Sequence, residues 1–156
     1  MFYYKNINDI ATSLDGLIAK IELSDNFQMF IEQCYNQLRF PDYFGFNMDS
    51  ISDCLRDLSW LKEQTVNIVI INSIQLLSKS TLKDYIELFC DIEKFWQQYC
   101  EKFHLESDII YAQHKKQLPW LSEDEIKNLA MPRSVRFYFS EEDKIKIDNL
   151  ISHVDN

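Results

Sequence analysis

The segment VNIVIIN at residues 66–72 places the strongest constraint on the fold of this chain. An uninterrupted run of β-branched and apolar residues predicts a strand that is buried on both faces, which is typical of a parallel sheet. Two further segments favour strands, LIAKIEL at 17–23 and SVRFYFS at 134–140. Helical patterns separate all three, and parallel strands need such crossovers. The sequence therefore predicts a small α/β fold, with helices packed on a parallel sheet.

Three helices are predicted between the first and last strands. Apolar residues recur at helical spacing over 27–38, and Pro41 stops that helix. Asn47 is a favourable N-cap for a second helix that runs to about Ser59. The longest helix is expected over 80–103, where an apolar and aromatic stripe faces the core.

The remaining segments are less regular. Residues 104–132 are more polar and are interpreted as an insertion, with a short helix that begins at a capping box formed by Ser122 and Glu125. A C-terminal helix is expected over 141–154. The aromatic residues at 2–4 could add an edge strand or merely cover the sheet, and the sequence leaves both possibilities open.

The size and charge of the chain limit the number of its domains and the kinds of partner that it can bind. Apolar residues make up 46% of the chain, which is enough for one domain to bury a core, so a single domain is expected over 1–156, with its core at 17–103 and 134–140. The net charge of −9 disfavours direct binding to nucleic acid or to an anionic membrane. The same charge would attract a basic protein partner.

The N-terminal sequence and the cysteines indicate a cytoplasmic protein. The first twenty residues show no basic region followed by an apolar run, and no later stretch has 18 consecutive apolar residues. The cysteines form no C-x-x-C pair and no zinc-binding spacing, so reduced, structural thiols are expected. They are Cys34, Cys54, Cys90 and Cys100.

The helix predicted at 47–59 has two different faces at about 100° per residue. Its apolar side carries Met48, Ile51, Cys54, Leu55 and Leu58. Its other side carries Asp49, Asp53 and Asp57. Because these acids follow i, i+4 spacing, neighbouring Cβ atoms lie about 5–6 Å apart and the carboxylates repel one another. Stability alone does not favour such a row.

Aromatic residues accompany these acids within residues 40–61. They are Tyr43, Phe44, Phe46 and Trp60. Rigid aromatic side chains beside carboxylates are typical of a protein-binding face. The alternative is an ordinary solvated surface helix on which Arg56 pairs with Asp53 at i, i+3 spacing. The helix pattern by itself leaves both interpretations open.

The segment FPDYFGFNMDSISDCL at residues 40–55 resembles the binding loop and second helix of the barstar family, whose prototype is the intracellular inhibitor of the ribonuclease barnase. The matching residues share one register without a gap. They are Pro41, Tyr43, Gly45, Asn47, Asp49, Asp53, Cys54 and Leu55. The register extends back to residue 17, and the order of elements extends forward to residue 140.

The resemblance implies a three-stranded parallel sheet and a one-to-one inhibitor of a basic ribonuclease, with an immunity or antitoxin role. Asp49 and Asp53 would enter the ribonuclease active site as mimics of RNA phosphates. The adjoining contacts would come from Tyr43, Gly45, Asn47 and, on the long helix, Asp91. The resemblance does not determine the oligomeric state.

Several positions depart from the prototype at the predicted contact face. Ser52 and Leu58 stand where the prototype has tryptophans, and Arg56 and Asp57 replace small residues at the contact edge. An arginine there conflicts with part of a barnase-like site, so a target other than barnase is expected, and residues 104–132 could supply additional contacts. A rival interpretation keeps the fold but assigns it a non-ribonuclease toxin or another protein partner.

The sequence does not favour catalysis. Acid–base chemistry needs carboxylates with different pKa values in a concave site, whereas a helix face is convex. His104, His114 and His153 do not form an H-E-x-x-H motif, and no nucleotide-binding or nucleophile motif is present. The expectation is therefore a protein that is not an enzyme and that uses neither a cofactor nor a metal ion.

Overall fold

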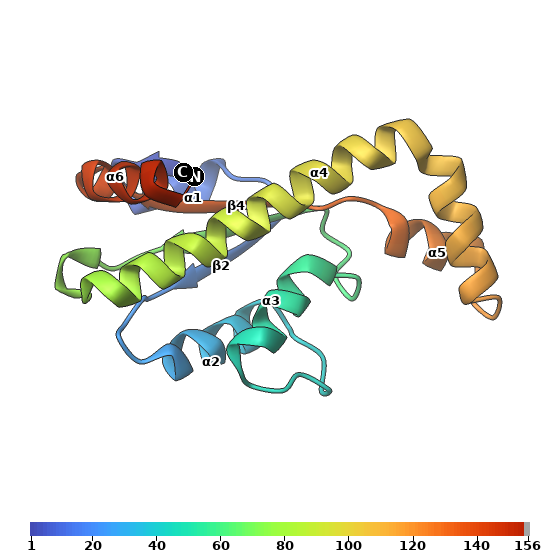
Figure 1. Ribbon diagram of the computed structural model, residues 1–156, viewed down its shortest axis with the longest axis horizontal. Helices are drawn as coiled ribbons and strands as arrows, with labels where there is room; N and C mark the ends of the chain where they lie inside the picture. The colour runs from blue at the N-terminus through green and yellow to red at the C-terminus, as the bar shows by residue number, and fades with distance from the viewer. Residues whose placement is uncertain (155–156) are drawn as a thin grey trace.

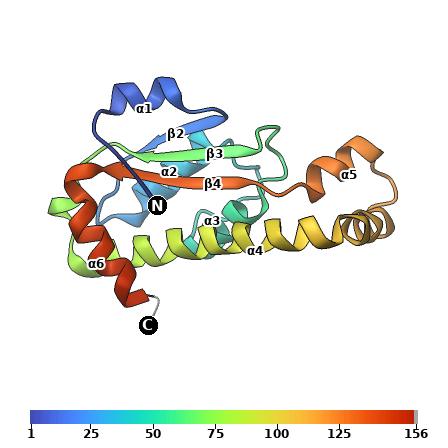
Figure 2. The same cartoon turned by 90° about the horizontal axis from the view of Figure 1, so that it is seen from above.

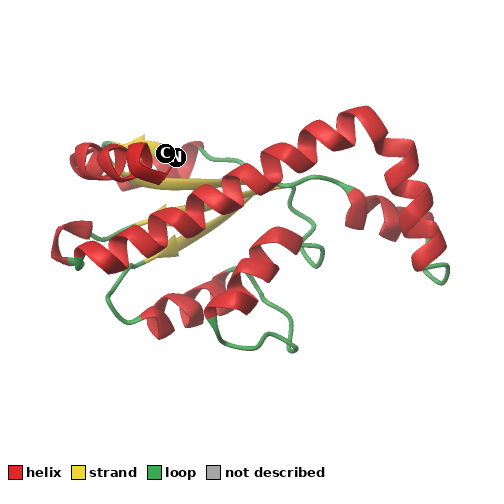
Figure 3. Ribbon diagram, viewed as in Figure 1, coloured by secondary structure: helices red, strands yellow, loops and turns green. Residues whose placement is uncertain are grey.

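The computed structural model describes residues 1–154, except for the side chains of Ala11, His153 and Val154. As predicted, it is an α/β fold in which helices pack on a parallel sheet (Figure 1, Figure 3). The strands are β1 (Phe2–Tyr4), β2 (Leu17–Ile21), β3 (Thr65–Ile70) and β4 (Ser134–Ser140). Their order across the sheet is β1-β4-β3-β2, and every neighbouring pair is parallel.

The sheet has four strands, so the expectation of three strands is wrong by one. The aromatic segment at the N-terminus forms the additional strand, β1, in which Phe2 lies opposite Tyr138 and stacks on its ring with the centroids 5.2 Å apart. The hydroxyl of Tyr4 donates a hydrogen bond of 2.6 Å to the carbonyl of Ile70. These contacts give the outer edge of β4 a partner, which removes an exposed row of unpaired backbone groups.

The prediction that β3 is buried on both faces is confirmed. The side chains from Val66 to Ile70 are all buried, although they alternate between the two faces of the sheet. Asn67 is among them, and its amide donates to the carbonyl of Asp15 at 2.7 Å and accepts from the hydroxyl of Tyr138 at 3.2 Å. The polar side chain is therefore satisfied within the sheet layer.

The helices are α1 (Ile7–Ser13), α2 (Phe27–Gln37), α3 (Met48–Asp57), α4 (Lys79–Gln117), α5 (Glu123–Ala130) and α6 (Lys144–Val154). Short 3-10 helices, η1 (Ile74–Leu76) and η2 (Glu141–Asp143), lie between longer elements. In Figure 2, α4 and α1 lie on opposite sides of the strands. One core cluster joins the sheet to α2, α3, α4 and α6, and Phe89 of α4 stacks on Phe137 of β4 with the centroids 4.2 Å apart.

The longest helix extends further at both ends than the sequence predicted. Its N-cap is Ser78, and it continues to Gln117 through a break at Glu106, where φ is −131° and ψ is 25°. The expected end near residue 103 is wrong because no helix-breaking residue occurs before Pro119. The last third of α4 and helix α5 together form an arm, defined as residues 104–132, that projects from one end of the molecule in Figure 1.

The arm contains the predicted short helix. Ser122 and Glu125 form the expected capping box at the start of α5, because the Ser122 side chain accepts from the Glu125 N–H while the Glu125 carboxylate accepts from the Ser122 N–H. Ile110 of α4 and Ile126 of α5 are buried. Apolar burial between the two helices therefore holds the arm together.

Candidate functional site

The loop between α2 and α3 is anchored by an aromatic cluster. Phe40 and Phe44 are buried, with their ring centroids 4.9 Å apart. Trp60, which follows α3, packs edge-on against Phe40 at 5.5 Å and donates a hydrogen bond of 3.0 Å from Nε1 to the carbonyl of Leu38. Phe40, at the start of the loop, and Trp60, after α3, therefore pack in the same cluster. This packing fixes the position of the loop relative to α3.

The start of α3 is tightly packed around Asn47, as predicted. The Asn47 side chain accepts a hydrogen bond of 2.9 Å from the N–H of Ser50 and donates one of 3.2 Å to the carbonyl of Gly45. A Cβ atom on Gly45 would lie only 2.6 Å from the hydroxyl oxygen of Ser50. Phe46 has a left-handed φ of 48°. Asn47 thus has a structural role, and Gly45 is required by close approach.

Helix α3 presents its apolar and acidic faces as the sequence predicted. Ile51, Cys54, Leu55 and Leu58 are buried. Asp49, Asp53 and Asp57 are exposed, and within residues 1–154 none of them accepts a hydrogen bond or forms an ion pair. The helix therefore displays a row of carboxylates that no hydrogen bond or ion pair of the described residues engages.

Tyr43 brings the loop close to this row. Its side chain is 75% exposed, yet its pKa lies above the ordinary value because its hydroxyl is partly desolvated and lies in the negative field of Asp57. Burial, followed by the charges of Asp57 and Asp53, also raises the pKa of the Cys54 thiol. Cys54 is therefore a protonated, structural thiol, and among the described residues the cysteines form no disulfide.

The basic residue of α3 does not pair with its neighbouring acid. The guanidinium carbon of Arg56 lies 5.8 Å from the ring centroid of Phe95 on α4. Within the described part of the chain no ion pair joins Arg56 to Asp53, so the pairing expected for an ordinary surface helix is absent. Ser52 is half-buried on the same helix.

Asp91 lies on α4, which packs against α3. It is exposed and stands one helical turn before Phe95, so the two residues share one face of α4. Since Phe95 contacts Arg56, Asp91 lies on α4 one turn before the point where this helix contacts Arg56 of α3. The fold thus gathers the predicted residues of the loop, α3 and α4 on adjoining elements.

Two residues that support this surface were not predicted from the sequence. Phe95 lies outside the apolar stripe that identified α4, and only the fold brings it to Arg56. Arg133 is 3% exposed and donates from Nη2 to the carbonyls of Leu61 at 3.2 Å and Asn128 at 3.0 Å. Burial lowers the pKa of Arg133, and the charge of Asp57 opposes that shift. Arg133 therefore connects α5 of the arm to the segment that follows α3, near Asp57.

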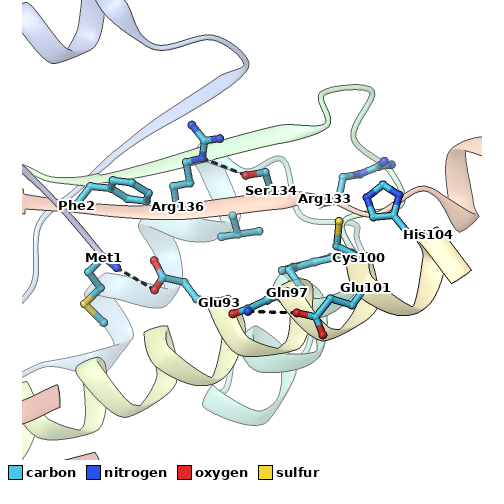
Figure 4. Close-up of a pocket in the computed structure, with 12 residues that line it drawn as sticks. Met1, Phe2, Glu93, Gln97, Cys100, Glu101, His104, Arg133, Ser134 and Arg136 are labelled. Atoms are coloured by element: carbon cyan, nitrogen blue, oxygen red, sulfur yellow. Dashed lines mark hydrogen bonds and ion pairs between the residues drawn. The ribbon is translucent and has the colours of Figure 1, made fainter. Parts of the chain in front are cut away.

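A separate pocket of about 430 Å³ lies between α4, β1 and β4 (Figure 4). Met1 and Glu93 lie at one end, where the α-amino group pairs with the carboxylate at 3.0 Å, and Cys100, His104 and Arg133 lie at the other end. Glu93 is two positions from Phe95, which places it on the other side of α4. The pocket is therefore separate from the face formed by α3 and its loop.

Among the described residues, no group of three or more His, Cys, Asp or Glu side chains is arranged to hold a metal ion. No described helix is both long and apolar enough to cross a bilayer.

Comparison with known proteins identifies one family. The family described as Barstar (barnase inhibitor) matches residues 17–108, which is more than half of the chain. The matched region contains the loop, α3 and Asp91, together with β2, β3 and most of α4. No curated protein and no solved structure gave a significant match.

Proposed function

Because the chain belongs to the barstar family, we propose that it inhibits a ribonuclease by filling the enzyme's basic active site with α3 and the 40–47 loop. One inhibitor molecule would block one active site and would itself catalyse no reaction. The observation that carries the proposal is the row formed by Asp49, Asp53 and Asp57, which is exposed and forms no ion pair within residues 1–154.

The chemistry of an RNA-binding site explains why such a row would bind there. A ribonuclease must hold phosphate groups, so its cleft carries cationic side chains. Asp49 and Asp53 would replace phosphates and accept charge-assisted hydrogen bonds from those cations. Because α3 holds both carboxylates in place before binding, little side-chain entropy is lost when the complex forms. Asp57 and Asp91 would extend the acidic surface at its edge.

The loop supplies the remaining contacts in this proposal. Tyr43 is the most exposed aromatic residue of the loop, and Phe46 is 43% exposed beside it. Phe46 packs on Tyr35 of α2 with the centroids 4.7 Å apart, so its position is fixed before binding. Gly45, Asn47 and Ser52 would contribute mainly by shape, since the polar atoms of Asn47 are already engaged with Gly45 and Ser50.

In this proposal the inhibitor acts in the cytoplasm. There it would serve as an immunity protein and protect the producing cell's own RNA from the ribonuclease. The net charge of −9 suits this role, because it would draw in a basic enzyme over a distance and repel RNA. Association should therefore slow as salt is added, since salt screens charges that are separated by more than about 10 Å.

The test is to titrate the chain into the ribonuclease encoded beside its gene and into a panel of basic microbial ribonucleases. We expect one-to-one binding by calorimetry and loss of RNA cleavage. Asp53→Asn should weaken binding by about 3–5 kcal/mol, because it leaves the enzyme's cations buried without a partner. Asp84→Asn is the matched control, since Asp84 is an exposed acid of α4 outside the site. Equal inhibition by Asp53→Asn would contradict the proposal.

A second candidate function keeps the fold but replaces the target with a non-ribonuclease toxin or another protein. Arg56 favours this candidate, because a cation on the binding face opposes a pocket that is lined only by cations. Co-expression with the neighbouring gene product separates the two functions. Rescue of growth without any effect on RNA cleavage would favour the second candidate.

A further inference from the structure

Arg56 stands in the middle of an acidic surface but does not neutralise it. Asp53 precedes it by less than one helical turn and Asp57 follows it directly. An i, i+3 ion pair with Asp53 is available to any arginine at this position. The guanidinium instead lies over the ring of Phe95, with the guanidinium carbon 5.8 Å from the centroid.

The contact with Phe95 has two consequences for the arginine. Stacking on an aromatic face restricts the long side chain to one orientation, so less entropy is lost when the guanidinium binds a partner. The stacking also leaves hydrogen-bond donors unused. Nε of Arg56 is buried without a partner, so a binding protein can reach only the donors of Nη1 and Nη2, and neither of these donates a hydrogen bond within residues 1–154. An oriented cation with unused donors is prepared to bind an acceptor.

The neighbours of Arg56 limit what can approach it. Asp53 and Asp57 flank it on α3, and Asp91 lies on the same face of α4 as Phe95. In a complex, cations of the partner would face these carboxylates. A further partner cation opposite Arg56 would face a like charge, which is strongly unfavourable once the interface excludes water.

We propose that Arg56 determines specificity by binding a carboxylate of the partner ribonuclease, and that this carboxylate lies beside the cations bound by Asp53 and Asp57. The inference rests on the proposed function and adds the kind of ribonuclease that fits. The planar guanidinium matches a carboxylate through two parallel hydrogen bonds. The partner's cleft therefore carries alternating charge, and a cleft lined only by cations is rejected.

The experiment uses the ribonuclease that the wild-type chain inhibits most tightly in the panel described above. Arg56→Met removes the charge but keeps an unbranched apolar stem, and Arg56→Lys keeps the charge but loses the planar donors. Lys20→Met is the matched control, because Lys20 is an exposed cation on β2. Unchanged melting temperatures establish that the variants fold.

We expect Arg56→Met and Arg56→Lys each to weaken binding at least tenfold, whereas Lys20→Met changes it less than twofold. Changing the partner's facing Asp or Glu to its amide should weaken wild-type binding by a similar factor but should not further weaken binding of Arg56→Met, as a double-mutant cycle requires. Unchanged or tighter binding by Arg56→Met overturns the inference and leaves the proposed function intact. Failure of the wild-type chain to bind any ribonuclease overturns both.

Discussion

The indole Nε1 of Trp96 donates a hydrogen bond of 2.8 Å to the backbone carbonyl of Leu55. This carbonyl lies in the last turn of α3, where carbonyl groups have no helical donor within reach. Leu58, which follows the helix, adopts a left-handed φ of 50° and ends the helical pattern. Trp96 of α4 therefore caps the acidic helix from the side and fixes the distance between α3 and the long helix.

Trp96→Phe should destabilise the protein, because it removes this donor and leaves the buried Leu55 carbonyl unsatisfied. The expected loss in the free energy of unfolding is about 1–3 kcal/mol. Chemical denaturation followed by circular dichroism measures it. Trp120→Phe is the matched control, since Trp120 is 72% exposed on the arm, and a change within about 0.5 kcal/mol is expected there. Equal losses for the two variants would contradict the capping role.

The elements that could be predicted from the sequence are those specified by neighbouring residues. The buried strand β3, the helix that ends before Pro41 and the capping box at Ser122 each depend on side chains within a few positions of one another. The N-cap at Asn47 is of the same kind. Periodicity and capping chemistry act within one or two turns, so these features can be read from the sequence without tertiary contacts.

The features that were missed depend on residues far apart in the sequence. Strand β1 has three residues, too few for an alternating pattern, and it forms because β4 offers an open edge. The contact between Arg56 and Phe95 exists only because α4 packs on α3. The i, i+3 spacing offered a pair with Asp53 as one of two interpretations, and the contact with the aromatic ring is found in its place. The partner contacts themselves stay predictions, since they involve another molecule.

Acid should destabilise the protein partly through Asp25. Its carboxylate accepts hydrogen bonds from the side chain of Thr81 and from the N–H of Ser78, the latter at 3.1 Å, and these bonds hold its pKa below the ordinary value. A lowered pKa in the folded state contributes stability above the unfolded-state pKa, and that stability is lost as the pH falls. The loss should occur from roughly pH 5 downward through pH 3.

Asp25→Asn removes this titrating group, so its stability should fall less steeply with acid than that of the wild type. The measurement is the free energy of unfolding in urea between pH 3 and pH 6 for both proteins. Asp84→Asn serves again as the control, because it removes an equal charge from an exposed position on α4. The same slope for Asp25→Asn and wild type would mean that other acids, such as Glu63 and Glu125, account for the effect.

The geometry at the start of α3 gives a last prediction, in which a second substitution should reverse the effect of the first. In Gly45→Ala the new methyl group would lie 2.6 Å from the Ser50 hydroxyl oxygen and 3.1 Å from the side-chain nitrogen Nδ2 of Asn47. Either the Ser50 side chain or the loop must shift to relieve this contact, and overpacking that moves the loop costs up to about 1–3 kcal/mol. Inhibition should weaken in parallel, because the same loop carries Tyr43 and leads into Asp49.

Ser50→Ala removes the hydroxyl that causes the closest contact but keeps the backbone N–H that binds Asn47. The double variant Gly45→Ala/Ser50→Ala should therefore recover most of the lost stability and inhibition, whereas Asn47→Ala should lose about 1 kcal/mol with the cap and gain nothing from Ser50→Ala. Thermal melts and inhibition assays on the wild type and on these single and double variants measure these effects. If the double variant is as impaired as Gly45→Ala, the restriction at Gly45 comes from Asn47, and the cap itself sets the position of the loop.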